Sequence, residues 1–121
     1  MTLEILIIED SVLIGKKLKE LISENISDYM LRQAKSITEA LRMVTELNPN
    51  VVFLDINLPD GNGMQVLTHL KKLNQKIKVI IFSNAANDFY RRKFMENGCD
   101  YFLDKSKDFT QIPQIISSLV A

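Results

Sequence analysis

The chain has 121 residues, 46% hydrophobic and 25% charged, which is typical of a single globular domain with one core. Its 15 basic and 15 acidic residues cancel, so no net field draws the chain to nucleic acid or to an anionic membrane. A lone cysteine, Cys99, excludes an intrachain disulfide and favours a reducing, cytoplasmic setting, and the N-terminal sequence MTLEILIIED contains neither a signal peptide nor a membrane span.

Five short apolar segments predict β-strands, because they are rich in β-branched residues and too short for typical helices. In chain order they cover about 3–8, 29–34, 51–54, 78–82 and 101–103. The segment 29–34 carries the most polar residues. It is therefore expected at an edge of the sheet, while the segment 3–8 is expected to be buried on both faces.

A helix is predicted after each strand, because apolar residues recur there at helical spacing. Ser36 followed by Glu39 forms a capping box at the start of the second helix. Asn87 or Asp88 is expected to cap the fourth helix, and Thr110 the fifth. The five helices are expected over about 12–24, 37–47, 64–73, 88–97 and 111–119.

Proline and glycine mark where several of these segments stop. Pro49 is expected to end the second helix and to hold Asn48 in an extended conformation. Gly98 is expected in the left-handed conformation after the fourth helix. Pro59 and Gly61, with the residues around them, predict a loop between the third strand and the third helix.

The alternation of strands and helices predicts an α/β protein. The expected fold is a doubly wound, five-stranded parallel sheet of the (βα)5 type, with helices on both faces. Such sheets carry their sites at the carboxyl ends of the strands. Four of the predicted strands end in polar residues: Glu9 and Asp10, then Asp55, then Ser83, then Lys105.

This set of residues predicts a site for a divalent cation and a phosphoryl group. Two carboxylates about 5 Å apart repel by roughly 3 kcal/mol at an effective dielectric constant of about 20, and one lysine does not offset three acids. Oxygen ligands near solvent favour Mg²⁺, which takes further ligands from water or phosphate. Asp55 is central and is the candidate nucleophile, which would form an acyl phosphate. Lys105 and Ser83 are expected to contact the phosphoryl oxygens.

Together these residues resemble the receiver domain of a two-component response regulator. The resemblance covers essentially the whole chain, and 1–121 is expected to be one receiver domain without an output domain. It implies the strand order 2-1-3-4-5 and phosphorylation of Asp55 by a histidine kinase or a histidine phosphotransfer protein. The motifs that carry it are ED at 9 and 10, LD at 54 and 55 followed by LPDGNG, Ser83, and DK at 104 and 105.

The resemblance also implies how the site works. It implies movement of Ser83 toward the phosphoryl group and an inward turn of Phe102. The face formed by the fourth helix, fifth strand and fifth helix would then change and control a downstream protein or an output domain, or form a dimer. The implied Mg²⁺ ligands are Glu9, Asp10, Asp55 and the backbone carbonyl of Asn57, while Lys105 contacts the phosphate.

Three positions depart from the common receiver pattern. Asn84 stands where a small residue is usual, and its bulk is expected to restrict access to Asp55. Ser106 replaces a proline that often follows a cis bond; a cis bond before serine would cost about 2.5–4 kcal/mol, so a trans bond and a different loop are expected. Phe102 replaces tyrosine, so its part in any switch is packing alone.

The basic run Arg91 to Lys93 is interpreted as a solvated face, with a partner contact as the alternative.

Three other functions are alternatives to a phosphorylated receiver. A degenerate receiver would act as a constitutive interaction module, with Asn84 obstructing phosphorylation. An aspartyl phosphatase would need a second acid two residues after its nucleophile, where this chain has Asn57. A flavodoxin-type binder would need a Ser/Thr/Gly-rich phosphate loop after the first strand, where this chain has EDSVLIG.

Overall fold

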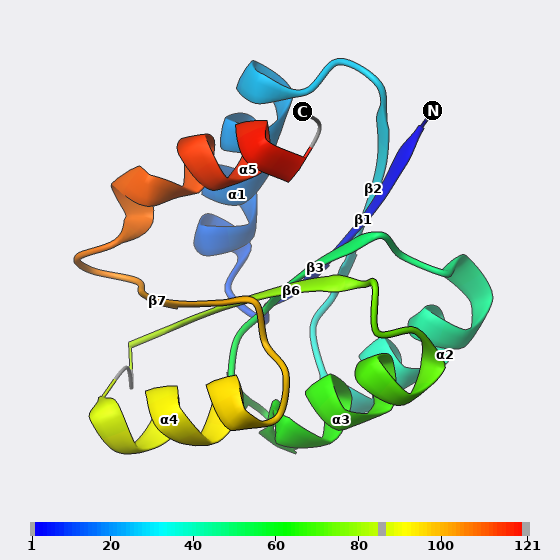
Figure 1. The fold of residues 1–121 in the computed structure, drawn as a ribbon. Helices are drawn as coiled ribbons and strands as arrows, with labels where there is room; N and C mark the ends of the chain where they lie inside the picture. The colour runs from blue at the N-terminus through cyan, green and yellow to red at the C-terminus, as the bar shows by residue number, and fades with distance from the viewer. Residues whose placement is uncertain (1, 85–86, 120–121) are drawn as a thin grey trace.

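The computed structural model describes residues 2–84 and 87–119, and within them five parallel strands form one sheet (Figure 1). The strands lie in the order β2-β1-β3-β6-β7. Counted within the sheet, this is the order 2-1-3-4-5, so the predicted fold is confirmed. The most polar strand lies at an edge, as predicted. The bounds are β1 (Leu3–Ile8), β2 (Tyr29–Ala34), β3 (Val51–Leu54), β6 (Lys78–Ser83) and β7 (Tyr101–Asp104).

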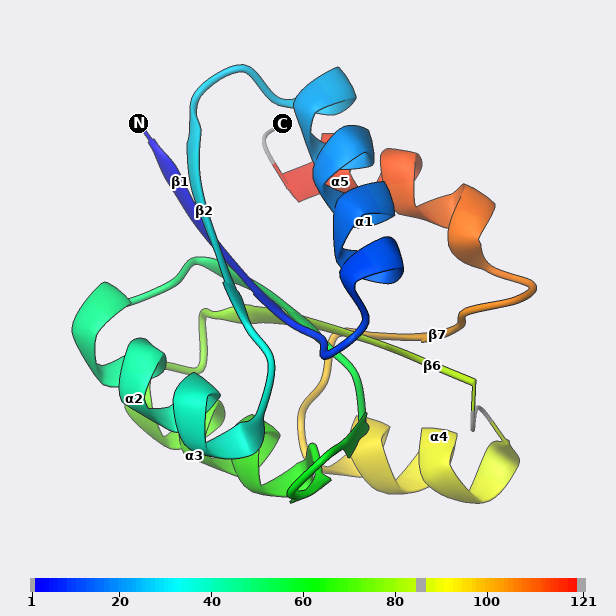
Figure 2. The ribbon, with the colours of Figure 1, turned by 180° about the vertical axis from the view of Figure 1, so that it is seen from behind.

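Helices cover both faces of the sheet. Helices α1 and α5 lie on one face, and α2, α3 and α4 lie on the other (Figures 1 and 2). No helix in the described ranges is long and apolar enough to cross a membrane. The bounds are α1 (Val12–Asn25), α2 (Ile37–Leu47), α3 (Met64–Leu73), α4 (Asp88–Glu96) and α5 (Ile112–Leu119).

The central strand β3 shows why the apolar runs in the sequence are continuous. Its residues alternate between the two faces, as side chains of a strand must. Val52 and Leu54 belong to the core under α2, α3 and α4, whereas Val51 and Phe53 belong to the core under α1 and α5. Because both faces are covered, all four residues are buried. Asp55 follows directly and is delivered to the carboxyl edge of the sheet.

Two of the three predicted N-caps are present. The Ser36 hydroxyl accepts a hydrogen bond from the Glu39 N–H at 3.1 Å, and the Asn87 side chain caps α4. The prediction for Thr110 is wrong. This residue lies inside a short 3₁₀ helix, η1 (Phe109–Gln111), that runs directly into α5. Phe109 packs against the core under α1 and α5, and the chain already turns helically before Ile112.

The predicted conformation of Asn48 is also wrong. Asn48 has φ 47° and ψ 63°, which is left-handed and not extended. Asparagine tolerates this conformation better than most residues, and a left-handed residue commonly ends a helix. The turn brings Asn50 beside β1, where its side chain accepts a hydrogen bond from the Glu4 N–H at 2.7 Å. Gly98 has φ 103°, in agreement with its predicted role after α4.

The predicted loop after β3 contains a small antiparallel hairpin, β4 (Asn57–Leu58) and β5 (Gly61–Asn62). Asp60 at its tip accepts hydrogen bonds from the N–H groups of Ile37, at 2.8 Å, and Thr38, at 3.0 Å. These bonds lower the pKa of Asp60. They also tie the hairpin to the start of α2, which positions the loop next to Asp55.

Candidate functional site

Three segments that are distant in the sequence meet at the carboxyl edge of the sheet. Lys105, just after β7, places its Nζ 2.6 Å from Oε1 of Glu9 and 3.0 Å from Oδ2 of Asp55. The Lys105 side chain is 9% exposed, and those of Glu9 and Asp55 are 0% and 5% exposed. The predicted gathering of these residues is therefore observed, with the lysine joining the ends of β1 and β3.

Asp10 completes an acidic cluster beside this lysine. Glu9, Asp10 and Asp55 each offer a carboxylate oxygen, and these oxygens lie within 4.8 Å of one another. Asp10 is exposed whereas the other two are buried, so the cluster opens to solvent on one side. One ammonium does not balance three carboxylates at this spacing. An oxygen-only donor set with an open side fits Mg²⁺, which keeps several of its waters.

Burial and pairing shift the pKa values of two of these groups. Burial raises the pKa of Glu9, and the hydrogen bonds from Lys105 and from the Ser11 N–H offset this only in part. For Lys105, burial acts to lower the pKa, but the hydrogen bonds to Glu9 and Asp55 overcome it and raise the pKa overall. Lys105 is therefore held as a cation against the acids.

Ser83 is the last residue of β6 and is fully buried. It pairs in the sheet with Asp104, and its carbonyl accepts a hydrogen bond from the Lys105 N–H at 3.2 Å. The structure thus places Ser83 on the strand next to Lys105, at the same edge as Asp55. Asn84 follows it and is exposed.

Asn57 lies two residues beyond Asp55, in the first strand of the hairpin. Its N–H donates to Asp55 Oδ1 at 3.2 Å. The loop packs closely against the strand, because a Cβ on Gly63 would lie 3.1 Å from the Asp55 carbonyl oxygen. The Asp60 contacts to α2 hold the far end of the same hairpin. Asn57 is thereby held next to the acidic cluster.

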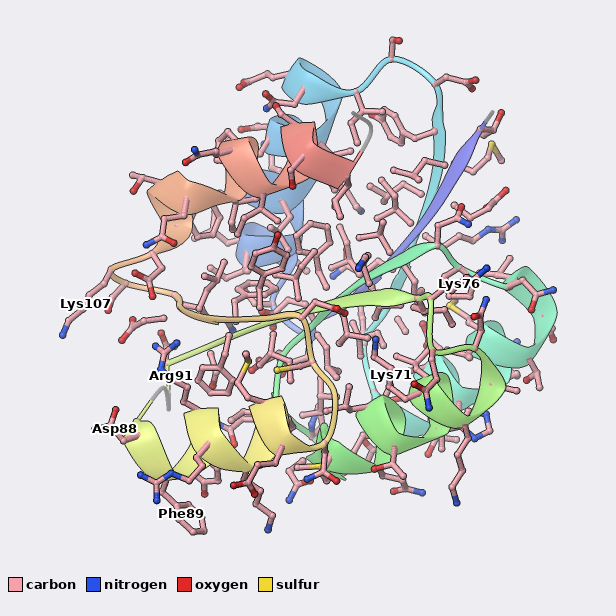
Figure 3. All side chains as sticks on the ribbon, in the orientation of Figure 1. Lys71, Lys76, Asp88, Phe89, Arg91 and Lys107 are labelled. Carbon is pink, nitrogen blue, oxygen red and sulfur yellow. The ribbon has the colours of Figure 1, made fainter. Side chains whose placement is uncertain are left out.

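Phe102 is already turned into the protein. Its side chain is 3% exposed, and its ring centroid is 6.0 Å from that of Phe94 on α4. Arg91 covers it, with Cζ 5.2 Å from the ring centroid and Nη1 donating to the Phe102 carbonyl at 2.8 Å. Figure 3 shows Arg91 reaching from α4 toward β7. Arg91, Arg92 and Lys93 are all exposed, in agreement with the interpretation of the basic run as a solvated face, and Arg91 packs on Phe102 in addition.

The loop after β7 is built without a proline. No peptide bond in the described ranges is cis, as expected for Ser106. The Asp104 carboxylate accepts hydrogen bonds from the N–H of Ser106, at 2.8 Å, and from its hydroxyl, at 2.6 Å. These bonds lower the pKa of Asp104. The Asp108 carboxylate in turn accepts a hydrogen bond from the Asp104 N–H at 2.8 Å. Side-chain hydrogen bonds therefore hold the loop that carries Lys105.

Sequence reasoning missed two residues that support the site. Asp60 holds the hairpin, and Gln33 on β2 donates from Nε2 to the carbonyl oxygen of Glu9 at 2.8 Å. The LPDG motif offered a signal for Asp60, because aspartate in a turn often bonds to nearby N–H groups. A glutamine in a polar edge strand offered no comparable signal.

Comparison with known proteins agrees with this architecture. The chain is 31% identical over 117 residues to the sensory transduction protein LytT of Enterococcus faecalis, covering 94% of this chain and 46% of that protein. It is 29% identical over 116 residues to the transcriptional regulatory protein MalR of Bacillus subtilis, covering 95% and 49%. The chain thus spans about half the length of these curated relatives.

Solved structures match over nearly the full chain. The signal receiver domain of a DNA-binding response regulator from Colwellia psychrerythraea has a TM-score of 0.90 at 23% identity, with 98% of each chain covered. A LuxR-family DNA-binding response regulator from Staphylococcus aureus has a TM-score of 0.84 at 27% identity, with 98% of this chain and 99% of that chain covered. Residues 5–117 match the family described as the response regulator receiver domain. The chain belongs to that family.

Proposed function

We propose that this receiver domain is a phosphorylation-dependent switch that accepts a phosphoryl group on Asp55. The donor is a histidine kinase or a histidine phosphotransfer protein. The observation that supports this most directly is the position of the Lys105 ammonium, 3.0 Å from the Asp55 carboxylate and beside a solvent-open acidic cluster. A nucleophile, a cation and a metal-binding donor set are then present at one edge.

In the proposed transfer, an Asp55 carboxylate oxygen bonds to phosphorus while the bond from phosphorus to the donor histidine nitrogen breaks. The transition state is loose, so its main requirement is neutralisation of the three phosphoryl oxygens. Lys105 supplies one positive charge, and Ser83 supplies a hydroxyl donor. Bound Mg²⁺ supplies further neutralising charge. The residues proposed to hold it are Glu9, Asp10, Asp55 and, through its backbone carbonyl, Asn57.

We further propose that the domain does not turn over a small substrate. Asn57 stands where an aspartyl phosphatase carries its general acid, and its N–H donates to the Asp55 carboxylate. An amide does not transfer protons as a carboxylic acid does. The acyl phosphate would therefore persist and act as a signal. The domain assists its own phosphorylation and dephosphorylation through the charges around Asp55 and the Ser83 hydroxyl.

Intact mass after incubation with acetyl phosphate and Mg²⁺ tests the proposal. The unaltered protein is expected to gain one phosphoryl group, and Asp55→Ala is expected to gain none. Asp28→Ala is the matched control. It removes an exposed aspartate just before β2, at the amino end of the strand, and is expected to react normally. No gain by the unaltered protein, or an undiminished gain by Asp55→Ala, contradicts the proposal. Mg²⁺ binding without any gain would instead support the degenerate receiver.

The output face we propose consists of α4, β7 and α5, and it acts on a downstream protein, an output domain or a second copy of the domain. Phe102 on β7 is central to it, because the residue contacts both Phe94 and Arg91 of α4. Residues 1–121 are proposed to act as one receiver domain in the cytoplasm, without contacting nucleic acid or membrane themselves. Met1 and residues 85–86 and 120–121 lie outside the described ranges.

Arg91→Ala is expected to loosen Phe102. It removes a cation–π contact and a hydrogen bond, which together contribute about 1–2 kcal/mol to the free energy of unfolding. Urea denaturation measures this loss, and nuclear Overhauser contacts between the Phe94 and Phe102 rings are expected to weaken. Arg92→Ala removes the neighbouring arginine, which is exposed as Arg91 is, and should leave both measurements nearly unchanged because the contact with Phe102 comes from Arg91. Equal effects of the two substitutions would contradict a specific role for Arg91.

A further inference from the structure

The main chain of Glu9 is held from the edge strand β2 on both of its sides. Its N–H donates to the Ala34 carbonyl at 2.9 Å, which extends the sheet by one bond. Its carbonyl accepts from Nε2 of Gln33 at 2.8 Å. The second bond comes from a side chain and not from the strand backbone, so it depends on which residue occupies position 33.

Gly15 provides the space in which this Gln33 amide lies. Gly15 is a buried residue of α1. A Cβ placed on it would lie 2.6 Å from both Nε2 and Oε1 of Gln33, a separation well inside van der Waals contact. Because these atoms are the far end of a flexible side chain, an alanine at 15 would displace the amide before it displaced the helix.

We propose that Gln33 is a positioning residue for the acidic cluster, and that Gly15 is required to let it reach Glu9. The Glu9 carbonyl belongs to the peptide that joins Glu9 to Asp10, so a bond to this oxygen orients both acids. The Glu9 carboxylate is also fixed, because Oε2 accepts from the Ser11 N–H at 3.1 Å and Oε1 meets Lys105. The Gln33 bond fixes the peptide between the two acids, from which the exposed Asp10 side chain extends.

The Gln33 bond is expected to affect Mg²⁺ affinity. This expectation rests on the proposed function, in which the acidic cluster holds Mg²⁺. Mg²⁺ demands near-octahedral oxygen geometry, so small displacements of its ligands weaken binding. Groups that hold ligands without touching the metal have large effects on metal affinity. Loss of the Gln33 bond is therefore expected to weaken Mg²⁺ binding while all three carboxylates remain present.

The experiment is a Mg²⁺ titration of five proteins, with backbone amide NMR shifts as the measurement. Gln33→Leu removes the donor, and Gly15→Ala displaces it; each is expected to raise the Mg²⁺ dissociation constant by about tenfold, the lower end for ligand-supporting partners. Gln65→Leu, which replaces an exposed glutamine of α3, is the matched control and is expected to bind as the unaltered protein does. Without metal, the Asp10 amide shift should move in the first two variants only.

Two comparisons separate positioning from a general effect on folding. Alanine forms helix better than glycine, so Gly15→Ala should lose Mg²⁺ affinity without a fall in its thermal midpoint. The double variant of Gln33→Leu and Gly15→Ala should bind Mg²⁺ as Gln33→Leu does, because no amide is left for the Cβ to displace. Unchanged affinity in Gln33→Leu, additive losses in the double variant, or losses that follow the thermal midpoint would overturn the inference.

The titration and the intact-mass measurement together distinguish this inference from the proposed function. Variant-dependent Mg²⁺ binding in a protein that accepts no phosphoryl group supports the role of Gln33 and overturns phosphorylation of Asp55. Normal phosphorylation with equal Mg²⁺ affinities overturns the role of Gln33 alone. Absence of Mg²⁺ binding by the unaltered protein overturns both the inference and the metal part of the proposed function.

Discussion

Lys105→Met is expected to lower the free energy of unfolding by about 3 kcal/mol at pH 7, at the low end of the cost of breaking a buried ion pair. The substitution leaves Glu9 and Asp55 without the ammonium that lies 2.6 and 3.0 Å from them. Both carboxylates are buried, so water replaces the lost cation only from the side of the exposed Asp10. That open side is the reason for choosing the lower value.

This loss should depend on pH. Burial already raises the pKa of Glu9 above its ordinary value of 4.5, and without Lys105 the pKa rises further. A carboxyl group with a raised folded-state pKa binds its proton more tightly when folded, so stability falls as the pH rises from the unfolded value through the folded one. The raised pKa of Lys105 keeps that group charged across the same range. The deficit of Lys105→Met is therefore larger at pH 7 than at pH 5.

Urea denaturation at the two pH values measures this deficit. Lys107→Met is the matched control, because Lys107 is an exposed lysine two residues along the same loop (Figure 3). It is expected to change stability by about 0.5 kcal/mol or less. Added Mg²⁺ is expected to restore part of the loss in Lys105→Met, since a cation at the cluster replaces the missing charge. A pH-independent deficit, or an equal loss in both variants, would contradict the role given to the ion pair.

Phe53→Ala is expected to cost about 3–5 kcal/mol, the usual loss when a buried phenylalanine leaves a cavity. Phe53 is 1% exposed, and its ring meets that of Phe82 edge-on with the centroids 6.4 Å apart. The position lies in the central strand, where neighbouring strands limit how far the backbone can collapse. Since a domain of this size is stable by about 5–15 kcal/mol, the loss is a large share of the total.

Chemical denaturation of Phe53→Ala measures the cost, and Phe89→Ala provides the comparison. Phe89 is 68% exposed and points away from the sheet on α4 (Figure 3). Its contacts to Tyr90 and Lys93 lie at the surface, so its removal should cost about 1 kcal/mol or less. A loss in Phe53→Ala no larger than that in Phe89→Ala would show that the core under α1 and α5 tolerates the cavity.

The amino-acid sequence alone determined the fold and the chemical content of the site. Continuous apolar runs such as Val51–Leu54 are readable because burial on both faces removes the polar half of the usual strand pattern. Polar residues that directly follow those runs must lie at one edge of a parallel sheet. The sequence therefore predicts that Glu9, Asp55 and Lys105 lie close together. These features depend on local pattern and topology, so they are predictable from the sequence.

Only the tertiary structure decided which groups touch. Lys105 bridges Glu9 and Asp55, and Arg91 covers Phe102. Gln33 reaches the Glu9 carbonyl past Gly15, where a Cβ would lie 2.6 Å from the Gln33 amide. These contacts depend on side-chain rotamers and on close packing between distant segments, and neither has a signature in residue type or spacing.

The same reason explains the errors at element ends. The propensities of asparagine before proline and of threonine before a helix are weak local preferences. At Asn48, the left-handed turn that brings Asn50 to Glu4 outweighed the preference for extended backbone. At Thr110, packing of Phe109 started the helical turn early. Local preference indicates roughly where a helix begins or ends. The contacts that the chain makes on either side of that point decide the residue.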